Sequence, residues 1–444
     1  MPQVIGGQQK DIFITKVVLT ACAVLMFFFV TLAFPQIQNL CTNAYIISIL
    51  LSLVFAGGCL IFTLDKRIES IMPLLFVFAS LGAMLIVRGS LFYFISGDYS
   101  SFLEHWVDDF RNAPGLTGLT MDIGDYNMPY LYLLFGISRV NFPDLYLIKI
   151  ASVIFDIMLA YYASKLISLK SNSINVQIIA FVGTLALPTV IINSSMWGQC
   201  DSIYAALALA SIYHGVKGNS KLCFMFVALA FSVKLQTIFI FPVIVILLVL
   251  KKIDWKMCWI SAVSFIATLL PAIIVGKPIK DTVSIYFDQT STYDALNMNA
   301  TNIYKLVGEV SDEHFTTAAI FLAGAAVIAL LYFIYVCRDR VVSVSDYIYI
   351  AFLFSFIIPF LLPRMHDRYF FVADVLSFLV FMVNKKRWFV PVVTVMCSYI
   401  SYTYFVMGGK AIFEHKYAVI AAIFVVLIVA KDLAEKLYLK KEVY

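Results

Sequence analysis

Charged residues are scarce in this chain, and their scarcity excludes most classes of protein. Only 13% of the 444 residues are Asp, Glu, Lys or Arg, whereas 62% are hydrophobic and 16% are aromatic. A soluble domain carries about 25% charged residues. The mean hydropathy is +0.92, and apolar stretches of about 16 to 25 residues recur from end to end. The sequence therefore predicts an all-α polytopic membrane protein.

Several familiar motifs are also missing. The eight cysteines lie mostly inside apolar runs without C-x-x-C spacing, so we interpret them as small core residues. The chain has no G-x-x-x-x-G-K-[ST] loop for ATP, and no H-x-x-x-H or clustered D-x-D pattern for a metal. No cofactor is predicted, although a divalent metal is left open. The net charge of +5 is better explained by membrane topology than by nucleic acid, and we predict no nucleic-acid partner.

The apolar runs define about 12–14 transmembrane helices in one integral membrane unit, residues 1–444. The first run is expected to be a span and not a cleavable signal peptide, and no internal repeat is visible. The seventh and eighth runs are short and suggest a broken or re-entrant pair. The candidate spans are 16–34, 43–64, 71–95, 145–168, 175–193, 200–216, 221–236, 237–250, 257–275, 315–336, 344–361, 369–384, 388–406 and 417–431.

Basic residues in the short connections predict the orientation. Lys and Arg at 66–67, 251–256 and 385–387 fall on one side under this count, which makes that side and both termini cytoplasmic. Two long loops, 96–144 and 276–314, then lie on the other side. The first contains "YSSFLEHWVDDF" and "MPYLYLLFGISRV", which we expect to form helices that lie in the membrane interface.

Asp98 follows the third apolar run directly, in the segment "FISGDYSSFLEHW". A carboxylate where the chain leaves the membrane can act as general base toward an acceptor hydroxyl if its neighbours hold its geometry. It can equally serve as the N-cap of an interfacial helix. Asp125 and Tyr126, which precede Pro129, allow a similar pair of interpretations: substrate binding, or the start of a helix.

The short outer turn "NSSMWGQCDSIYAAL" joins the fifth and sixth runs. It brings Trp197, Gln199 and Asp201 together at a depth where polar groups are costly unless they are paired or face water. Trp197 alone could belong to an interfacial aromatic belt. Asp201, about one turn into a membrane helix, is harder to explain without a function.

Two further segments add polar groups on the same side. "SVKLQTIFIFP" holds Lys234 and Gln236 between the two short runs. An intramembrane Lys is a candidate functional residue, and snorkelling to the interface is the competing explanation. In the second long loop, Asn299 of "YDALNMNATNIYKLVGE" can hydrogen-bond sugar hydroxyls or simply stabilise the loop.

The last polar cluster is "LLPRMHDRYFF". Arg364, Arg368 and His366 offer hydrogen-bond donors suited to phosphate oxygens, and Tyr369 begins the next apolar run. The alternative is an anchor whose side chains snorkel at a helix end. Independent anchors should scatter over both faces of the membrane. The predicted topology instead gathers the acids and cations on one face, which indicates a shared polar cavity.

Two of these segments resemble the GT-C superfamily of integral membrane glycosyltransferases. "SSMWGQCDSIYA" and "LPRMHDRYFF" are similar to stretches of bacterial GT-C proteins in which W-G-Q-x-D and M-H-[DE]-R-Y recur at corresponding places. An acidic residue in the first large outer loop, with flanking interfacial helices, fits the same pattern. The resemblance spans most of residues 71–385. Asp98 stands in "GDY" and not in a D-x-D or E-x-D pair, which weakens the case for a metal-bound mechanism.

The resemblance implies a GT-C-like fold and transfer of a sugar from a polyprenyl-phosphate donor to a glycan or lipid-linked acceptor. The expected location is a bacterial plasma membrane, with the site on the outer face. Asp98 would be the general base. The implied donor-phosphate ligands are Lys234, His366 and Arg368, and the residues implied to shape the sugar or acceptor site are Trp197, Gln199 and Asp201.

Other functions fit parts of the sequence. A flippase or transporter for lipid-linked sugars would also have many spans and buried charges, but such proteins usually show internal repeats and polar sites near the bilayer midplane. A glycan polymerase or ligase would share the acidic loop and the cationic cluster. Because the polar residues gather at one face beside a long loop, we favour the glycosyltransferase.

Overall fold

A computed structural model describes residues 2–32, 44–288, 295–307, 313–406, 408–409 and 413–441. Parts of the predicted outer loop 276–314 fall outside these ranges. The described secondary structure is almost entirely helical, and its one sheet has two short strands. The predicted all-α class is confirmed.

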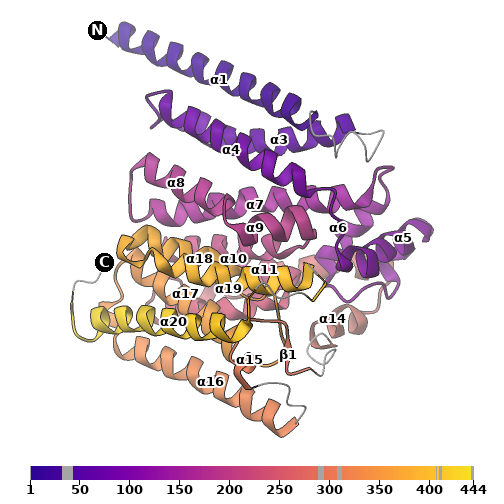
Figure 1. The fold of residues 1–444 in the computed structure, drawn as a ribbon, viewed down its shortest axis with the longest axis vertical. Coiled ribbons are helices and arrows are strands. Elements are labelled where there is room, and N and C mark those ends of the chain that lie inside the picture. Colours follow the sequence, from indigo (N-terminus) through magenta and orange to yellow (C-terminus); the bar gives the residue numbers. More distant parts are fainter. Residues whose placement is uncertain are drawn as a thin grey trace.

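Long apolar helices pack against one another and form the body of the molecule (Figure 1). Among the described residues, nine helical segments are long and apolar enough to cross a membrane, or ten if one bent pair counts as a single span. The chain is therefore a multi-pass membrane protein. The long helices are α1 (Pro2–Leu32), α3 (Ala44–Thr63), α4 (Met72–Leu91), α7 (Asp144–Ser168), α13 (Trp259–Val275), α16 (Glu313–Val336), α17 (Val344–Leu361), α19 (Phe389–Val406) and α20 (His415–Leu437).

The other predicted spans are occupied by shorter or interrupted helices. One of them bends by 53° between residues 185 and 188, and the predicted break between the seventh and eighth spans falls at Lys234. A helix thus lies along each of the fourteen predicted segments. These shorter elements are α8 (Ile174–Leu185), α9 (Pro188–Ile191), η3 (Ile192–Trp197), α10 (Asp201–Val216), α11 (Ser220–Val233), η4 (Leu235–Ile240), α12 (Phe241–Val249) and α18 (Phe371–Val383).

Local sequence signals explain several helix ends. Proline stands in the first turn of α4, α9 and α12. The backbone N–H groups of a first turn have no hydrogen-bond partner within the helix, so the N–H that proline lacks is not needed there. Ser343 and Asp346 form a capping box at the start of α17. Gly198 and Gly276 end η3 and α13 in the left-handed conformation that glycine adopts without strain.

Short elements cluster at one end of the bundle, where the two long loops lie. Figure 1 shows α5 and α14 at the right of the view and the start of α1 at the left. The structure has helices at both segments predicted to be helical in the first long loop, 99–110 and 128–140. The elements at this end are η1 (Tyr99–Leu103), α5 (Glu104–Asn112), η2 (Thr117–Thr120), α6 (Met128–Ser138), α14 (Ile279–Asp288), β1 (Asn297–Met298), α15 (Tyr304–Val307) and β2 (Met365–His366).

The opposite end holds the basic connections, including η5 (Trp255–Met257), η6 (Arg338–Arg340) and η7 (Lys385–Arg387). Basic side chains of this end contact the last turns of α18 and α20. The Lys170 ammonium donates to the Val383 carbonyl at 2.9 Å, Arg340 donates to the Leu437 carbonyl at 2.7 Å, and Arg387 pairs with Asp432 at 2.5 Å. The fold therefore separates a basic end from the end that carries the long loops.

The apolar interior consists of two clusters. One joins α1, α3 and α4 to one face of α7 and α8, with Phe27, Phe55 and Phe181 buried at its centre. The larger cluster fills the space among α6, α10, α11, α17 and α18. Helix α7 contributes to both clusters, so it lies between the first three helices and the rest of the bundle.

Candidate active site

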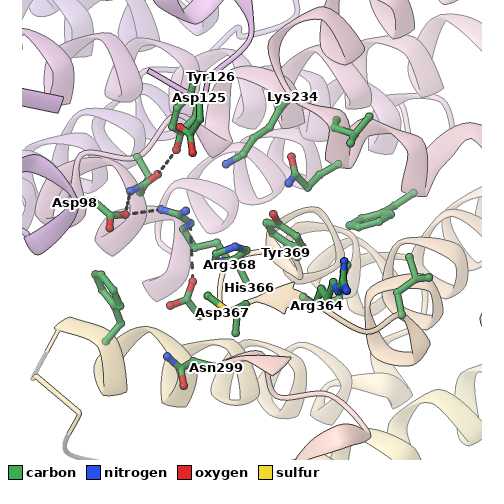
Figure 2. Close-up of a pocket in the computed structure, with 18 of the residues that line it drawn as sticks. Asp98, Asp125, Tyr126, Lys234, Asn299, Arg364, His366, Asp367, Arg368 and Tyr369 are labelled. Atoms are coloured by element: carbon green, nitrogen blue, oxygen red, sulfur yellow. Dashed lines mark hydrogen bonds and ion pairs between the residues drawn. The ribbon is translucent and has the colours of Figure 1, made fainter. Parts of the chain in front are cut away.

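A cavity of about 520 Å³ opens at the loop-bearing end of the bundle. The polar part of its wall comes from five parts of the chain that are far apart in the sequence: the segment around Asp98, the loop before α6, the turn before α10, the break before η4, and the two-stranded sheet with the loop that follows it. Figure 2 shows their polar side chains directed toward a common space. The cavity lies at one end of the bundle and not at its middle.

Asp98 is held by three donors from two other segments. Its Oδ2 accepts hydrogen bonds from the Trp197 indole N–H at 3.0 Å, from the Gln199 amide, and from the Arg368 guanidinium at 2.8 Å. Asp98 occupies the N-cap position of η1 but makes no side-chain capping bond. Among the described residues, no donor reaches its other oxygen, Oδ1. The capping interpretation is therefore wrong for this side chain, which is used for contacts across the cavity.

The segment that contains Asp98 and the segment that contains Trp197 each include a π-helical turn. η1 begins directly after Asp98, and η3 ends at Trp197. Such turns are rare and occur frequently at functional sites. Gly198 follows in the left-handed conformation with φ of 80°, and this sharp turn places Trp197 and Gln199 on the cavity wall.

Trp197 is fixed on both sides. Its ring stacks on Phe405 with centroids 4.8 Å apart, meets Tyr402 edge-on at 5.3 Å, and lies 5.1 Å from the Arg368 guanidinium carbon. Only 1% of Trp197 is exposed. An interfacial aromatic belt would leave this ring against lipid, so the belt interpretation does not describe Trp197.

Asp201 and Lys234 form a buried ion pair in which Lys234 lines the cavity and Asp201 lies behind it. The Lys234 ammonium contacts Asp201 Oδ1, and Asn193 donates to Oδ2 at 2.7 Å. Lys234 has extended backbone angles between α11 and η4, so the helix break turns its side chain inward. Its ammonium also lies 5.7 Å from the ring centre of Tyr126 and 5.9 Å from that of Tyr204. Lys234 is thus 7% exposed and does not snorkel to the interface.

The segment "LLPRMHDRYFF" forms a structured loop between α17 and α18. Its β2 pairs in parallel with β1, so that Asn297 lies opposite Met365 and Met298 opposite His366. Arg364 and Asn299 both have left-handed backbone angles, with φ of 60° and 65°. Such angles are uncommon outside glycine and cluster at functional sites. The sheet therefore fixes this loop to the second long loop.

Burial sets the protonation states in this loop. It lowers the pKa of His366 to about 3, with a further contribution from Arg368. It raises the pKa of Asp367 to about 7, although Arg368 opposes that shift. The pKa of Arg368 lies above its ordinary value because Tyr126, Asp98, Asp201 and Asp367 outweigh burial. Near pH 7, His366 is therefore a neutral ring that can donate one N–H, whereas Arg368 stays a cation.

The remaining predicted residues lie on the same wall. The Tyr126 hydroxyl donates to the Gln199 amide oxygen at 3.3 Å, and burial raises the pKa of Asp125. Asn299, Gln236, Arg364 and Tyr369 also line the cavity. Every predicted site residue lines it except Asp201, which contacts Lys234 and lies 4.0 Å from Arg368 Nε.

A second layer of polar residues beneath this wall was not predicted from the sequence. Helix α7 buries Lys149, Ser152 and Asp156, and all three contact the segments that carry Asp98 or Gln199. A signal for them was present, because two charged residues seven positions apart in an apolar run lie on one helix face and need partners. Within the described ranges, no cluster of three His, Cys, Asp or Glu side chains has the arrangement of a metal site.

The comparisons with known proteins fit this arrangement. The model of glycosyltransferase family 87, a membrane family of the GT-C type, matches residues 129–359, just over half of the 444-residue chain. Fold and match together define a multi-pass membrane glycosyltransferase. The chain belongs to glycosyltransferase family 87. A comparison with curated proteins finds no match.

The family match covers only part of the cavity wall. It includes Trp197, Gln199, Lys234 and Asn299, but it begins after Asp98 and ends before Arg368. The structure brings these unmatched residues to the matched ones. The cavity is thus the candidate active site of the enzyme.

Proposed function

We propose that this glycosyltransferase moves a sugar from a polyprenyl-phosphate donor to a hydroxyl of a glycan or lipid-linked acceptor, with Asp98 as general base. The observation that carries the proposal is the asymmetry of the Asp98 carboxylate. Three donors hold Oδ2, whereas no described residue donates to Oδ1. A carboxylate fixed through one oxygen keeps the other available for a proton from the acceptor.

Two cations in the same cavity suit the phosphate of the donor. Arg368 uses one guanidinium nitrogen for Asp98, and among the described residues its buried Nε has no hydrogen-bond partner. Lys234 has three ammonium donors and directs one of them to Asp201. Both cations therefore retain donors that can stabilise negative charge developing on a phosphate leaving group.

An apolar wall supports a lipid-linked donor. The side of the cavity formed by η4 and α16 is lined by Ile238, Phe239 and Ile320. Ile238 is 40% exposed and Ile320 is 52% exposed, so this side also belongs to the outer, lipid-facing surface of the helices. A prenyl chain can enter laterally along such a wall while its phosphate reaches the cations.

The chemistry follows from these positions. The acceptor oxygen attacks the anomeric carbon, its proton passes to Asp98, and the bond from the anomeric carbon to the phosphate oxygen breaks. The released polyprenyl phosphate takes up the negative charge that Lys234 and Arg368 stabilise. A single displacement of this kind inverts the anomeric centre.

The charge pattern supports an orientation for the enzyme. Basic connections gather at the end of the bundle opposite the cavity, as the Lys170, Arg340 and Arg387 contacts show. Lys and Arg in short loops favour the cytoplasm. We therefore assign the cavity to the non-cytoplasmic face of the plasma membrane, with both termini in the cytoplasm.

The test is a transfer assay with the purified protein in nanodiscs. Undecaprenyl-phosphate mannose, glucose, galactose and arabinose serve as donors, nucleotide sugars serve as comparison donors, and a glycolipid extract supplies acceptors. We expect transfer from at least one lipid-linked donor. The Asp98→Asn variant should lose it, and Asp109→Asn, which changes an exposed carboxylate on α5, should retain it. Transfer from nucleotide sugars alone would overturn the proposal.

A further inference from the structure

Helix α7 carries a polar stripe that is separate from the cavity wall. Lys149, Ser152 and Asp156 are three and seven positions apart, so they lie on one face of the helix. All three are buried, and the Lys149 side chain has no exposed surface. None of them lines the cavity.

Lys149 contacts the chain that leads to Asp98. Its ammonium donates to the carbonyls of Phe94 at 2.7 Å, Phe92 at 2.9 Å and Leu91 at 3.3 Å. These carbonyls belong to the last residue of α4 and to two of the three residues that follow it, a place where the helix dipole favours a cation. Lys149 therefore fixes the point from which the chain continues, four residues later, to Asp98.

The stem of Lys149 also packs against the turn that carries the Asp98 ligands. A Cβ added to Gly198 would lie 3.6 Å from Lys149 Cγ, so the stem runs directly beside that turn. One helical turn further along α7, Ser152 donates to the Gln199 carbonyl at 2.6 Å. The two segments are joined directly by Ser96, which donates to the Trp197 carbonyl at 2.8 Å.

The last member of the stripe holds the π-helical turn η3. Asp156 accepts from Ser194 at 2.6 Å and pairs with Arg88 of α4 at 2.6 Å, and Arg88 also donates to Ser195 at 3.0 Å. Both side chains of the ion pair are fully buried. The same face of α7 thus fixes the end of α4 and both sides of the Trp197–Gln199 turn.

Stability alone does not account for Lys149. Burying an ammonium is costly, and an apolar residue of similar shape usually serves a helix interior at least as well. Among the described residues, no carboxylate lies within ion-pair distance of Lys149 to compensate. What the charge provides is a fixed geometry between two segments whose side chains meet at Asp98 Oδ2.

We infer that Lys149 and Ser152 are positioning residues, which set the Asp98 carboxylate against Gln199 and Trp197 without touching substrate. The inference rests on the proposed role of Asp98. An error of about 1 Å in the placement of a catalytic group can cost about 100-fold in rate. Loss of the Lys149 and Ser152 contacts should therefore lower kcat and leave donor binding nearly unchanged, because Lys234 is paired with Asp201 and the loop that carries Arg368 is held by the pairing of β2 with β1.

The experiment compares Lys149→Met, which keeps the stem and removes the charge, with Ser152→Ala and with Lys170→Met as matched control. Lys170 also donates to the end of a helix, at the Val383 carbonyl, but it lies at the other end of α7, about 30 Å away at 1.5 Å per residue. We expect Lys149→Met to lower kcat about 10- to 100-fold with a donor KM within about threefold of wild type. Ser152→Ala should change kcat in the same direction by a smaller factor, and Lys170→Met should leave it unchanged.

A double variant separates positioning from a general structural effect. If Lys149 acts through Asp98, Asp98→Asn/Lys149→Met should be no slower than Asp98→Asn alone. Multiplied losses in the double variant, or a kcat for Lys149→Met equal to that of Lys170→Met, would overturn the inference. If Lys149→Met does not fold, the kcat of Ser152→Ala decides the test instead. Wild-type transfer by Asp98→Asn would instead refute the proposed function itself.

Discussion

Replacement of Arg368 by alanine is the sharpest test of how the donor phosphate is bound. The Arg368 side chain is 12% exposed, and its Asp98 partner is 20% exposed. The guanidinium contacts Asp98 at 2.8 Å and lies 3.9 Å from Asp367 and 4.0 Å from Asp201. The variant therefore removes a cation that lies within 4.0 Å of three carboxylates, and a phosphate would then meet a less positive surface.

The expected loss of donor-phosphate affinity follows from how deeply Arg368 is buried. Truncating one member of a buried charge pair that takes part in binding costs about 2 to 5 kcal/mol, and the remaining exposure to the cavity places this case near the lower end. A loss of about 2 to 3 kcal/mol corresponds to a dissociation constant about 30- to 150-fold higher. The Lys234 ammonium should keep residual binding measurable.

The assay is a titration of the protein in nanodiscs with undecaprenyl phosphate, followed by native mass spectrometry. Arg387→Ala is the matched control, because Arg387 also pairs with a buried carboxylate, Asp432, at 2.5 Å, but at the opposite end of the bundle. We expect both variants to lose thermal stability and only Arg368→Ala to lose affinity. A dissociation constant for Arg368→Ala within about threefold of the control would refute the reasoning.

Three further predictions concern stability and topology. Arg88→Met leaves the Asp156 carboxylate buried without its cation, so the free energy of unfolding should fall by about 3 to 5 kcal/mol; a Tm equal to that of wild type would contradict this. Because burial raises the pKa of Asp367 from 3.8 to about 7, the folded protein binds the extra proton in this window, and stability should fall as pH rises from 3.8 to 7. Asp367→Asn should remove this contribution to the pH dependence of stability, and parallel Tm–pH curves for the variant and the wild type would count against the prediction. A membrane-impermeant maleimide should label exposed Cys258 only after the cells are permeabilised, whereas it should label a cysteine placed at exposed Asp122 in intact cells. Labelling of both positions from the same side of the membrane would refute the topology.

Much of the fold could be predicted from the sequence because membrane spans are long and apolar. All fourteen segments contain a helix, and the short seventh and eighth runs meet at a break beside Lys234. The sequence indicated that the seventh and eighth runs are short, but it did not show that α10 and α18 are also shorter than a full span. The bend after residue 185 and the inward turn at Lys234 depend on packing against neighbouring helices, which periodicity does not record.

The residues of the site could be predicted for a related reason. Charged and amide side chains are costly in a membrane, so each one in or near an apolar run is informative. Asp98, Gln199 and Arg368 were therefore recognisable as a set once the topology placed them on one face. Their pairing was not, because the partners of Asp98 stand 99, 101 and 270 residues away.

The supporting layer was hidden by a more ordinary explanation. Lys149 stands near the end of a predicted span, where snorkelling explains a lysine without any partner. Its contacts are backbone carbonyls at and just beyond the end of α4, and the position of a backbone carbonyl cannot be recognised from the residue types in a sequence. Single-sequence reasoning can thus find the polar side chains of such a site more readily than the residues that position them.

The central claim is that Asp98 accepts the acceptor proton, and one paired measurement tests it directly. Sugar transfer and undecaprenyl phosphate binding are measured on Asp98→Asn and wild type in the same nanodiscs. A positioned general base contributes about 100- to 10,000-fold, so we predict a loss of transfer in that range. Binding should not weaken, because Arg368 loses a competing carboxylate. Transfer by Asp98→Asn within about tenfold of wild type would contradict the claim.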